Sequence, residues 1–170
     1  MPASPDAQGA HELAVRLIAE LTERRMTIAV AESLTGGLVV AELVSVPGAS
    51  AVVRGGVVAY ATDLKSTLLG VDAELLAERS PIDPEVAMQM AEGARRLAGR
   101  DGAPADLGLA TTGVAGPDQQ DGHPVGEVWI GVALGDRLEA QGLMLAGDRA
   151  SIRWAAVARS LMFALELLAE

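Results

Sequence analysis

The 170-residue chain has no cysteine, which excludes disulfide bonds, a thiol nucleophile and thiolate metal ligands. No apolar run reaches the length of a membrane span, because Glu42 interrupts the longest one. The opening residues MPASPDAQG lack the basic and apolar regions of a secretion signal. We therefore expect residues 1–9 to form a disordered tail and the protein to be cytoplasmic.

Basic residues are also scarce. The chain has 13 basic and 23 acidic residues, which gives a net charge of −10. Such a charge disfavours nucleic acid and anionic membranes as partners, and a small anionic ligand needs a local positive site. Lys65 is the only lysine among these basic residues. Because lysine can lose its proton in a protein and arginine cannot, Lys65 is a candidate base.

Half of the residues are apolar, which is enough for one domain over residues 10–170. The early alternation of helix and strand predicts a parallel sheet covered on both faces, and a late strand pair adds antiparallel pairing. The predicted fold class is α/β, a three-layer α/β/α sandwich with a mixed, mostly parallel sheet of about five strands. Apolar spacing predicts helices over 11–24, 38–44, 62–69, 83–99 and from Asp148 onward, and strands over 27–31, 55–61, 107–112, 127–134 and 137–145.

Polar residues follow three of these strands. Glu32 and Ser33 follow the first strand, Tyr60 lies at the end of the second, and Thr112 and Gly113 lie at the end of the third. In open α/β sheets, ligands bind beyond the carboxyl ends of the strands. The sequence therefore predicts that these residues meet in one crevice.

The stretch AESLTGG, residues 31–37, joins the first strand to a helix. The N–H groups of Gly36 and Gly37 at the helix start would bind a phosphate, or the oxyanion that forms when Ser33 attacks a carbonyl. The alternative is that Thr35 and the glycines only cap the helix at a tight turn.

A serine nucleophile needs a base that takes its proton. The two histidines, His11 and His123, lie in the opening helix and in a polar loop, away from the strand ends, so Lys65 remains. Its place near a helix start and partial burial would both lower its pKa. Tyr60 would then orient the lysine or relay the proton. The alternatives are a solvated lysine and an ordinary strand tyrosine.

Three further features each have two interpretations. Arg149 is either a surface residue or a phosphate clamp. The loop with Asp118, Asp121 and His123 is interpreted as solvated, so no metal site is expected. The apolar face around Trp154 belongs either to the core or to a contact in a homo-oligomer.

Several motifs together resemble the C-terminal domain of the CinA family, a domain that also occurs alone as a nicotinamide-nucleotide amidohydrolase. They are AESLTGG, GGVVAYATDLK, EVAMQMAEGAR, TTGVAGP, PVGEVWIGVA and GDRASIR, and the resemblance covers about residues 10 to 168. It implies hydrolysis of nicotinamide mononucleotide to nicotinate mononucleotide and ammonia, without metal or organic cofactor. We expect the chain to be such a stand-alone domain, without the N-terminal molybdopterin-binding-like domain of full-length members.

The resemblance also implies residue roles. Ser33 matches the nucleophile, Lys65 the base and Tyr60 an accompanying tyrosine, whereas Arg149 matches a position that meets the phosphate. Thr112 and Gly113 match the motif that lines the reaction centre. Together with the strand-end argument, this predicts substrate contacts from Glu32, Thr35, Gly36, Gly37, Thr112, Gly113 and Arg149.

The chain departs from the family pattern in four places. Leu34 replaces a cysteine, Glu127 replaces a common threonine, residues 81–84 alter a helix start, and the loop 118–123 is short and acidic. The loop 118–123 and Glu127 border the expected substrate crevice, so these two changes leave the substrate open. A non-catalytic nucleotide-binding module and an amidohydrolase for another small amide therefore remain alternatives.

Overall fold

The computed structural model describes residues 5–170, which form one five-stranded sheet in the order β2-β1-β3-β4-β5. β1 pairs in parallel with both β2 and β3, whereas β4 pairs antiparallel with both β3 and β5. The predicted mixed sheet is confirmed. Its strands are β1 (Ile28–Glu32), β2 (Val53–Val58), β3 (Leu107–Gly113), β4 (Glu127–Leu134) and β5 (Arg137–Met144).

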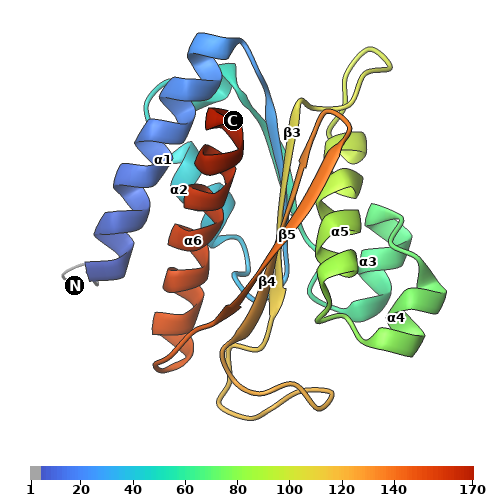
Figure 1. Cartoon of the computed structure of the whole chain (residues 1–170). Coiled ribbons are helices and arrows are strands. Elements are labelled where there is room, and N and C mark those ends of the chain that lie inside the picture. Colours follow the sequence, from blue (N-terminus) through green and yellow to red (C-terminus); the bar gives the residue numbers. More distant parts are fainter. Residues whose placement is uncertain (1–4) are drawn as a thin grey trace.

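Helices cover both faces of the sheet, which confirms the three-layer α/β/α arrangement (Figure 1). One side carries α1 (Pro5–Arg24), α2 (Leu38–Val44) and α6 (Arg149–Ala169), and the other carries α3 (Thr62–Leu69), α4 (Ala73–Arg79) and α5 (Pro84–Leu97). A short 3-10 helix, Ala49–Ala51, precedes β2.

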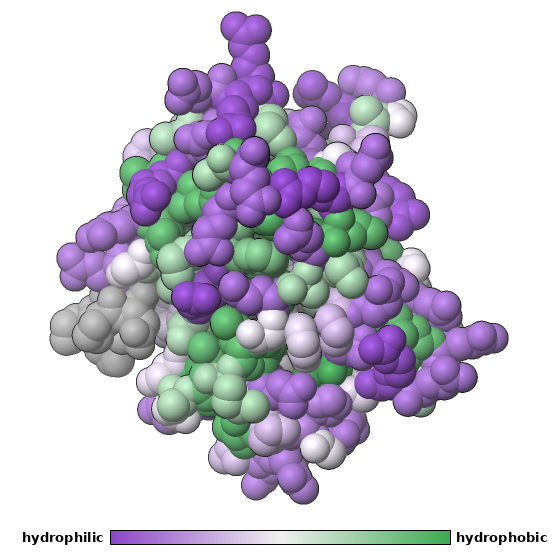
Figure 2. Space-filling model, in the orientation of Figure 1, coloured by the Kyte–Doolittle hydropathy of each residue, from purple (hydrophilic) through white to green (hydrophobic). Residues whose placement is uncertain are grey.

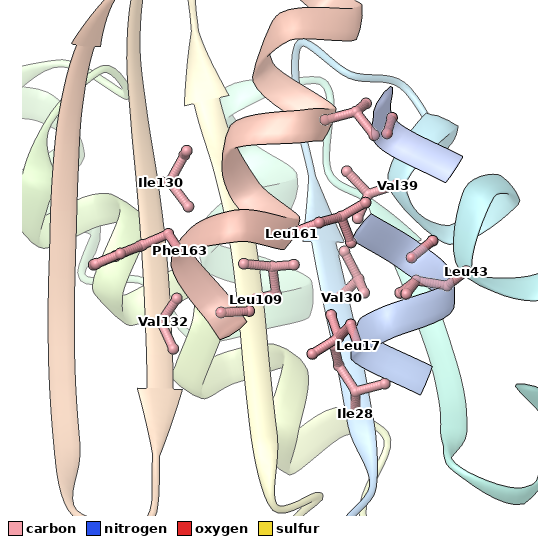
Figure 3. Close-up of a cluster of buried hydrophobic side chains, with 14 of the residues drawn as sticks. Leu17, Ile28, Val30, Val39, Leu43, Leu109, Ile130, Val132, Leu161 and Phe163 are labelled. Atoms are coloured by element: carbon pink, nitrogen blue, oxygen red, sulfur yellow. The ribbon is translucent and has the colours of Figure 1, made fainter. Parts of the chain in front are cut away.

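The core consists of two clusters, one on each face of the sheet. Figure 3 shows the larger cluster, in which Leu17 of α1, Val39 of α2 and Leu161 of α6 face Val30 and Leu109 of the sheet. Trp154 packs against this cluster, so the apolar face of α6 is core. Hydrophilic side chains dominate the rim of the molecule in Figure 2, with apolar ones between them.

Two glycines let α5 lie directly on the sheet. A Cβ added at Gly108 would lie 2.1 Å from the carbonyl oxygen of Ala91, and one at Gly131 would lie 2.0 Å from that of Ala87. Any side chain would therefore push the helix away. The close packing fixes α5, whose start carries residues 80–82 to the carboxyl end of the sheet.

Three predictions about the elements were wrong. The strand predicted over 55–61 is Val53–Val58, so Tyr60 lies beyond its end. Helix α1 begins at Pro5, so the predicted tail does not extend over residues 5–9, and residues 1–4 lie outside the described part. Helix α4 was not predicted. It has seven residues, of which only Leu76 is buried, and the Asp72 carboxylate caps it by accepting the N–H of Glu74 at 2.8 Å. Such a short helix carries too little periodicity to be recognised.

Among the described residues, no helix combines the length and apolar character that crossing a membrane requires.

Candidate active site

Ser33 and Lys65 meet at the carboxyl end of the parallel strands. Ser33 follows β1, and its N–H donates to the carbonyl oxygen of Thr111 at 3.0 Å, which holds the turn against β3. Lys65 lies one turn into α3, and its Nζ is 3.2 Å from Ser33 Oγ. The ammonium nitrogen also donates to the carbonyl oxygen of Ala59 at 2.9 Å. The structure thus brings the predicted nucleophile and the predicted base within hydrogen-bond distance.

The Lys65 side chain is buried, with 1% of its surface exposed. No carboxylate within residues 5–170 forms an ion pair with it. Burial penalises the charged form and lowers the Lys65 pKa from 10.5 to about 8. Desolvation is therefore the cause of the lowered pKa, and a useful fraction of the amine is neutral near physiological pH.

This pKa predicts how activity depends on pH. Because only neutral Lys65 can accept the Ser33 proton, we expect kcat/KM to rise through a pKa of about 8 and to level off above it. Initial rates between pH 6 and about 10 would check this. A flat profile over that range would contradict a lysine base.

The same pKa predicts a stability effect with a definite sign. Between about pH 8 and 10.5 the unfolded chain binds more protons than the folded one, so the free energy of unfolding should rise with pH. The slope is at most about 1.4 kcal/mol per pH unit for one proton. Urea denaturation at several pH values would measure it, and a Lys65→Met variant should lack the rise.

Glu32 has a structural role that differs from the predicted substrate contact. Its carboxylate is fully buried and accepts N–H groups at the start of α2, from Gly37 at 2.9 Å, Val39 at 3.1 Å and Val40 at 2.9 Å. A negative charge is favourable there because of the partial positive charge at a helix N-terminus. The side chain is occupied by the fold, so the predicted substrate contact of Glu32 is wrong.

The glycines and Thr35 are likewise used by the turn itself. Gly36 donates its N–H to the Ser33 carbonyl oxygen at 3.1 Å, and the Gly37 N–H goes to Glu32. Thr35 does not cap α2; its buried hydroxyl lies 2.7 Å from that of Thr111. The predicted anion cradle at Gly36 and Gly37 is therefore wrong for these two N–H groups.

Tyr60 and Arg149 form the rim of the site. Arg149, the first residue of α6, donates to the carbonyl oxygen of Gly116 at 2.7 Å and to the Tyr60 hydroxyl at 3.1 Å. Tyr60 is 59% exposed. Lys65 donates to Ser33 and Ala59, so the Tyr60 hydroxyl does not orient the lysine, and its alternative role as a proton relay stays a prediction.

A cavity of about 100 Å³ opens above Ser33 and Lys65. Thr112 and Gly113 line it as predicted, and the Thr112 hydroxyl donates to the Pro81 carbonyl oxygen at 2.6 Å. The loop between β3 and β4 extends at the same end of the sheet (Figure 1). The other lining residues are Leu34, Tyr60, Thr62, Pro81, Ile82, Val114, Ala115, Gly116, Asp118, Gln120 and Arg149.

One important residue was not predicted. Arg153, one turn into α6, donates to the carbonyl oxygens of Leu34 at 3.0 Å and Thr35 at 2.8 Å. It thereby fixes the turn that follows Ser33. Arg153 ends the GDRASIR motif, but neither its spacing nor its neighbours reveal this role, because its partners lie more than a hundred residues earlier.

Comparison with known sequences identifies relatives along most of the chain. A CinA-like protein of Frankia casuarinae is 47% identical over 149 residues, covering 88% of this chain and 33% of the relative. A putative competence-damage inducible protein of Geobacillus kaustophilus is 42% identical over 158 residues, covering 92% and 37%. The chain thus spans about a third of the length of these relatives.

Solved structures share the fold over nearly the whole chain. The competence/damage inducible protein CihA of Agrobacterium tumefaciens superposes with a TM-score of 0.88 at 32% identity, covering 100% of both chains. The competence damage-inducible protein A of Klebsiella pneumoniae gives a TM-score of 0.89 at 33% identity, covering 95% of this chain and 98% of that one. The sequence model of the CinA C-terminal domain matches residues 10–169, and the chain therefore belongs to the CinA C-terminal domain family.

Proposed function

We propose that this chain hydrolyses the carboxamide of nicotinamide mononucleotide to nicotinate mononucleotide and ammonia, by a Ser33–Lys65 mechanism. The observation that carries the proposal is a buried lysine of lowered pKa, 3.2 Å from a serine hydroxyl at the floor of a cavity. A nucleophile and a neutral base in hydrogen-bond contact constitute the machinery of acyl transfer. The choice of this amide rests on the family resemblance.

The first half of the reaction forms a tetrahedral intermediate on Ser33. Neutral Lys65 accepts the Ser33 proton while Oγ attacks the carboxamide carbon, which gives a tetrahedral oxyanion. Leu34, the residue after the nucleophile, lines the cavity, and its N–H has no acceptor among residues 5–170. This N–H is therefore a suitable oxyanion donor. Arg153 supports it by fixing the Leu34 carbonyl oxygen on the other side of the residue.

The second half releases both products. Protonated Lys65 gives its proton to the amide nitrogen, and the C–N bond then breaks. Ammonia departs, and the acyl group remains bound to Ser33 Oγ as an ester. Lys65, neutral again, takes a proton from a water molecule that attacks this ester. The proton returns to Ser33 Oγ as nicotinate mononucleotide leaves, so no metal or organic cofactor is needed.

Arg149 is the suitable group for the substrate phosphate. It lines the cavity, and the Gly116 and Tyr60 oxygens hold its guanidinium in place. A guanidinium with two N–H groups engaged by fixed acceptors still has N–H groups for an anion. One such local cation can hold a single phosphate in a chain of net charge −10, because the binding of a small ligand depends on the potential at its site and not on the net charge of the whole surface.

The test is an assay of purified protein with nicotinamide mononucleotide, in which ammonia and nicotinate mononucleotide are both measured. We expect equimolar products from the wild type and none from Ser33→Ala. Ser50→Ala, at an exposed serine, is the matched control and should keep full activity. A well-folded wild type that binds the nucleotide without turnover would indicate the binding module instead, and turnover of another amide alone would indicate a different substrate.

A further inference from the structure

His123 connects two walls of the cavity. Its Nε2 lies 2.9 Å from Ser80 Oγ, and its Nδ1 lies 3.0 Å from a Glu127 carboxylate oxygen. His123 belongs to the loop between β3 and β4, whereas Ser80 follows α4. The contact therefore joins segments 43 residues apart in the sequence. We name Ser80, His123 and Glu127 the His123 clamp.

The loop side of this clamp is a tight turn. Gln120 and His123 exchange both backbone hydrogen bonds, at 3.1 and 2.8 Å, around Asp121 and Gly122. Both central residues have positive φ, of 51° and 82°, as a tight two-residue hairpin turn requires. Gln120 lines the cavity, so its position depends directly on where His123 is held.

The opposite side of the clamp is strained. Ser80 has φ 72° and ψ 163°, a region that side-chain-bearing residues rarely adopt. Its Oγ also accepts the Ile82 N–H at 3.1 Å. Pro81 and Ile82 line the cavity, and the Pro81 carbonyl oxygen accepts the Thr112 hydroxyl. The clamp thus holds a strained segment that forms one wall of the site.

The hydrogen-bond roles of the clamp are consistent with one another. The Glu127 carboxylate only accepts, so His123 Nδ1 donates to it, and Nε2 of the neutral ring then accepts the Ser80 hydroxyl proton. The second Glu127 oxygen accepts the Trp129 indole N–H at 3.3 Å, which orients the carboxylate. Each of these side chains has a hydrogen-bond partner that orients it, as in functional sites whose residues are held by neighbouring hydrogen bonds.

We propose that the His123 clamp sets the width of the cavity between Gln120 on one side and Pro81–Ile82 on the other, and thereby the fit of the substrate. The proposal rests on the function proposed above. The hydrogen bonds connect Ser80 to His123 and His123 to Glu127, which is the arrangement of a hydrolase catalytic triad. However, the residues lining the cavity with Ser33 and Lys65 do not include Ser80 or His123. We therefore assign the clamp a positioning role.

The first test compares His123→Ala and Ser80→Gly with the wild type in deamidation of nicotinamide mononucleotide. Ser80→Gly relieves the backbone strain, so a purely structural role predicts an unchanged or more stable and fully active protein. The clamp instead predicts that KM rises about tenfold in both variants while kcat changes less. His123→Gln, whose amide can reach Ser80, should restore most of the affinity.

His11→Ala is the matched control, because His11 pairs with Glu42 at 2.7 Å in the other histidine–carboxylate contact of the described chain. It should leave KM unchanged. Unchanged KM in both His123→Ala and Ser80→Gly would overturn the proposal. So would labelling of Ser80 by a serine-directed fluorophosphonate in a Ser33→Ala background, because Ser80 would then be a nucleophile.

A second readout needs no turnover. Hydrogen exchange of the Gln120 and His123 amides should be faster in His123→Ala and Ser80→Gly than in the wild type and in His11→Ala. If the wild type does not deamidate the nucleotide, the proposed function fails but this exchange still tests whether the clamp holds the loop. Unchanged exchange would overturn the clamp independently of the substrate.

Discussion

Lys65→Met should remove deamidation while leaving the fold intact. Methionine fills a buried site of similar volume without a charge, so we expect the free energy of unfolding to stay within about 2 kcal/mol of the wild type. The variant has no group that can accept the Ser33 proton. We therefore expect kcat/KM to fall by about 10³-fold or more, measured as ammonia release near pH 8.

Lys65→Arg is the complementary variant, since it keeps a positive charge and removes the base. It should be as inactive as Lys65→Met, but less stable, because its charge is buried and cannot be neutralised by proton loss. Circular dichroism and urea denaturation would separate loss of fold from loss of chemistry. Activity of Lys65→Met within tenfold of the wild type, alongside an inactive Ser33→Ala, would show that another group is the base.

Glu32→Gln should be strongly destabilising, although the two side chains have nearly the same shape. The carboxylate accepts three N–H groups, from Gly37, Val39 and Val40. An amide offers one oxygen and directs its own N–H groups toward these donors. We expect a loss of about 2–3 kcal/mol in the free energy of unfolding, and a Tm lower by about 4–12 °C.

The matched control is Glu20→Gln, which removes an exposed carboxylate that pairs with Arg24 one turn later in α1. Its effect should be below about 0.5 kcal/mol, as for other exposed ion pairs. Urea denaturation of both variants would give the comparison. Equal stability of the two would show that the buried carboxylate does not support the turn that holds Ser33.

The Ser33–Lys65 pair was predictable because two general rules converge on it. Residues at the carboxyl ends of parallel strands meet at one edge of the sheet, and a chain with only one lysine and two histidines offers few bases. Both rules use the order of helices and strands, which apolar spacing reveals. This order places the strand ends together and places the two histidines away from them. The bounds of α2, α3 and β4 were predicted to the residue, since glycines and other turn residues mark their ends, such as Gly70 after α3 and Gly135 after β4.

The assignments that failed depend on where individual hydrogen bonds go. Glu32 is a polar residue at a strand end, and the sequence alone does not show whether its carboxylate turns toward a ligand or back toward the start of α2. The same holds for Gly36 and Gly37, whose N–H groups are consumed within the turn. The helix start was predicted either to bind an external anion or to be only a capped turn, and the Glu32 carboxylate of the protein itself occupies it.

Other contributions to the site have no sequence signal at all. The carbonyl oxygen of Ala59 orients Lys65, and any residue at that position would offer the same atom. Arg153 is one of many arginines in the chain, and only the packing of α6 brings it to the turn after Ser33. Contacts of this kind follow from the tertiary structure and become readable only when it is known.

The buried lysine also makes the site open to spectroscopy. Because Lys65 is the only lysine, cells grown with isotope-labelled lysine would produce protein with a single labelled side-chain amine. Its NMR signal would report the protonation of that one group in the unmodified protein, without interference from any other lysine. Titration with substrate would then follow the amine directly as the cavity fills.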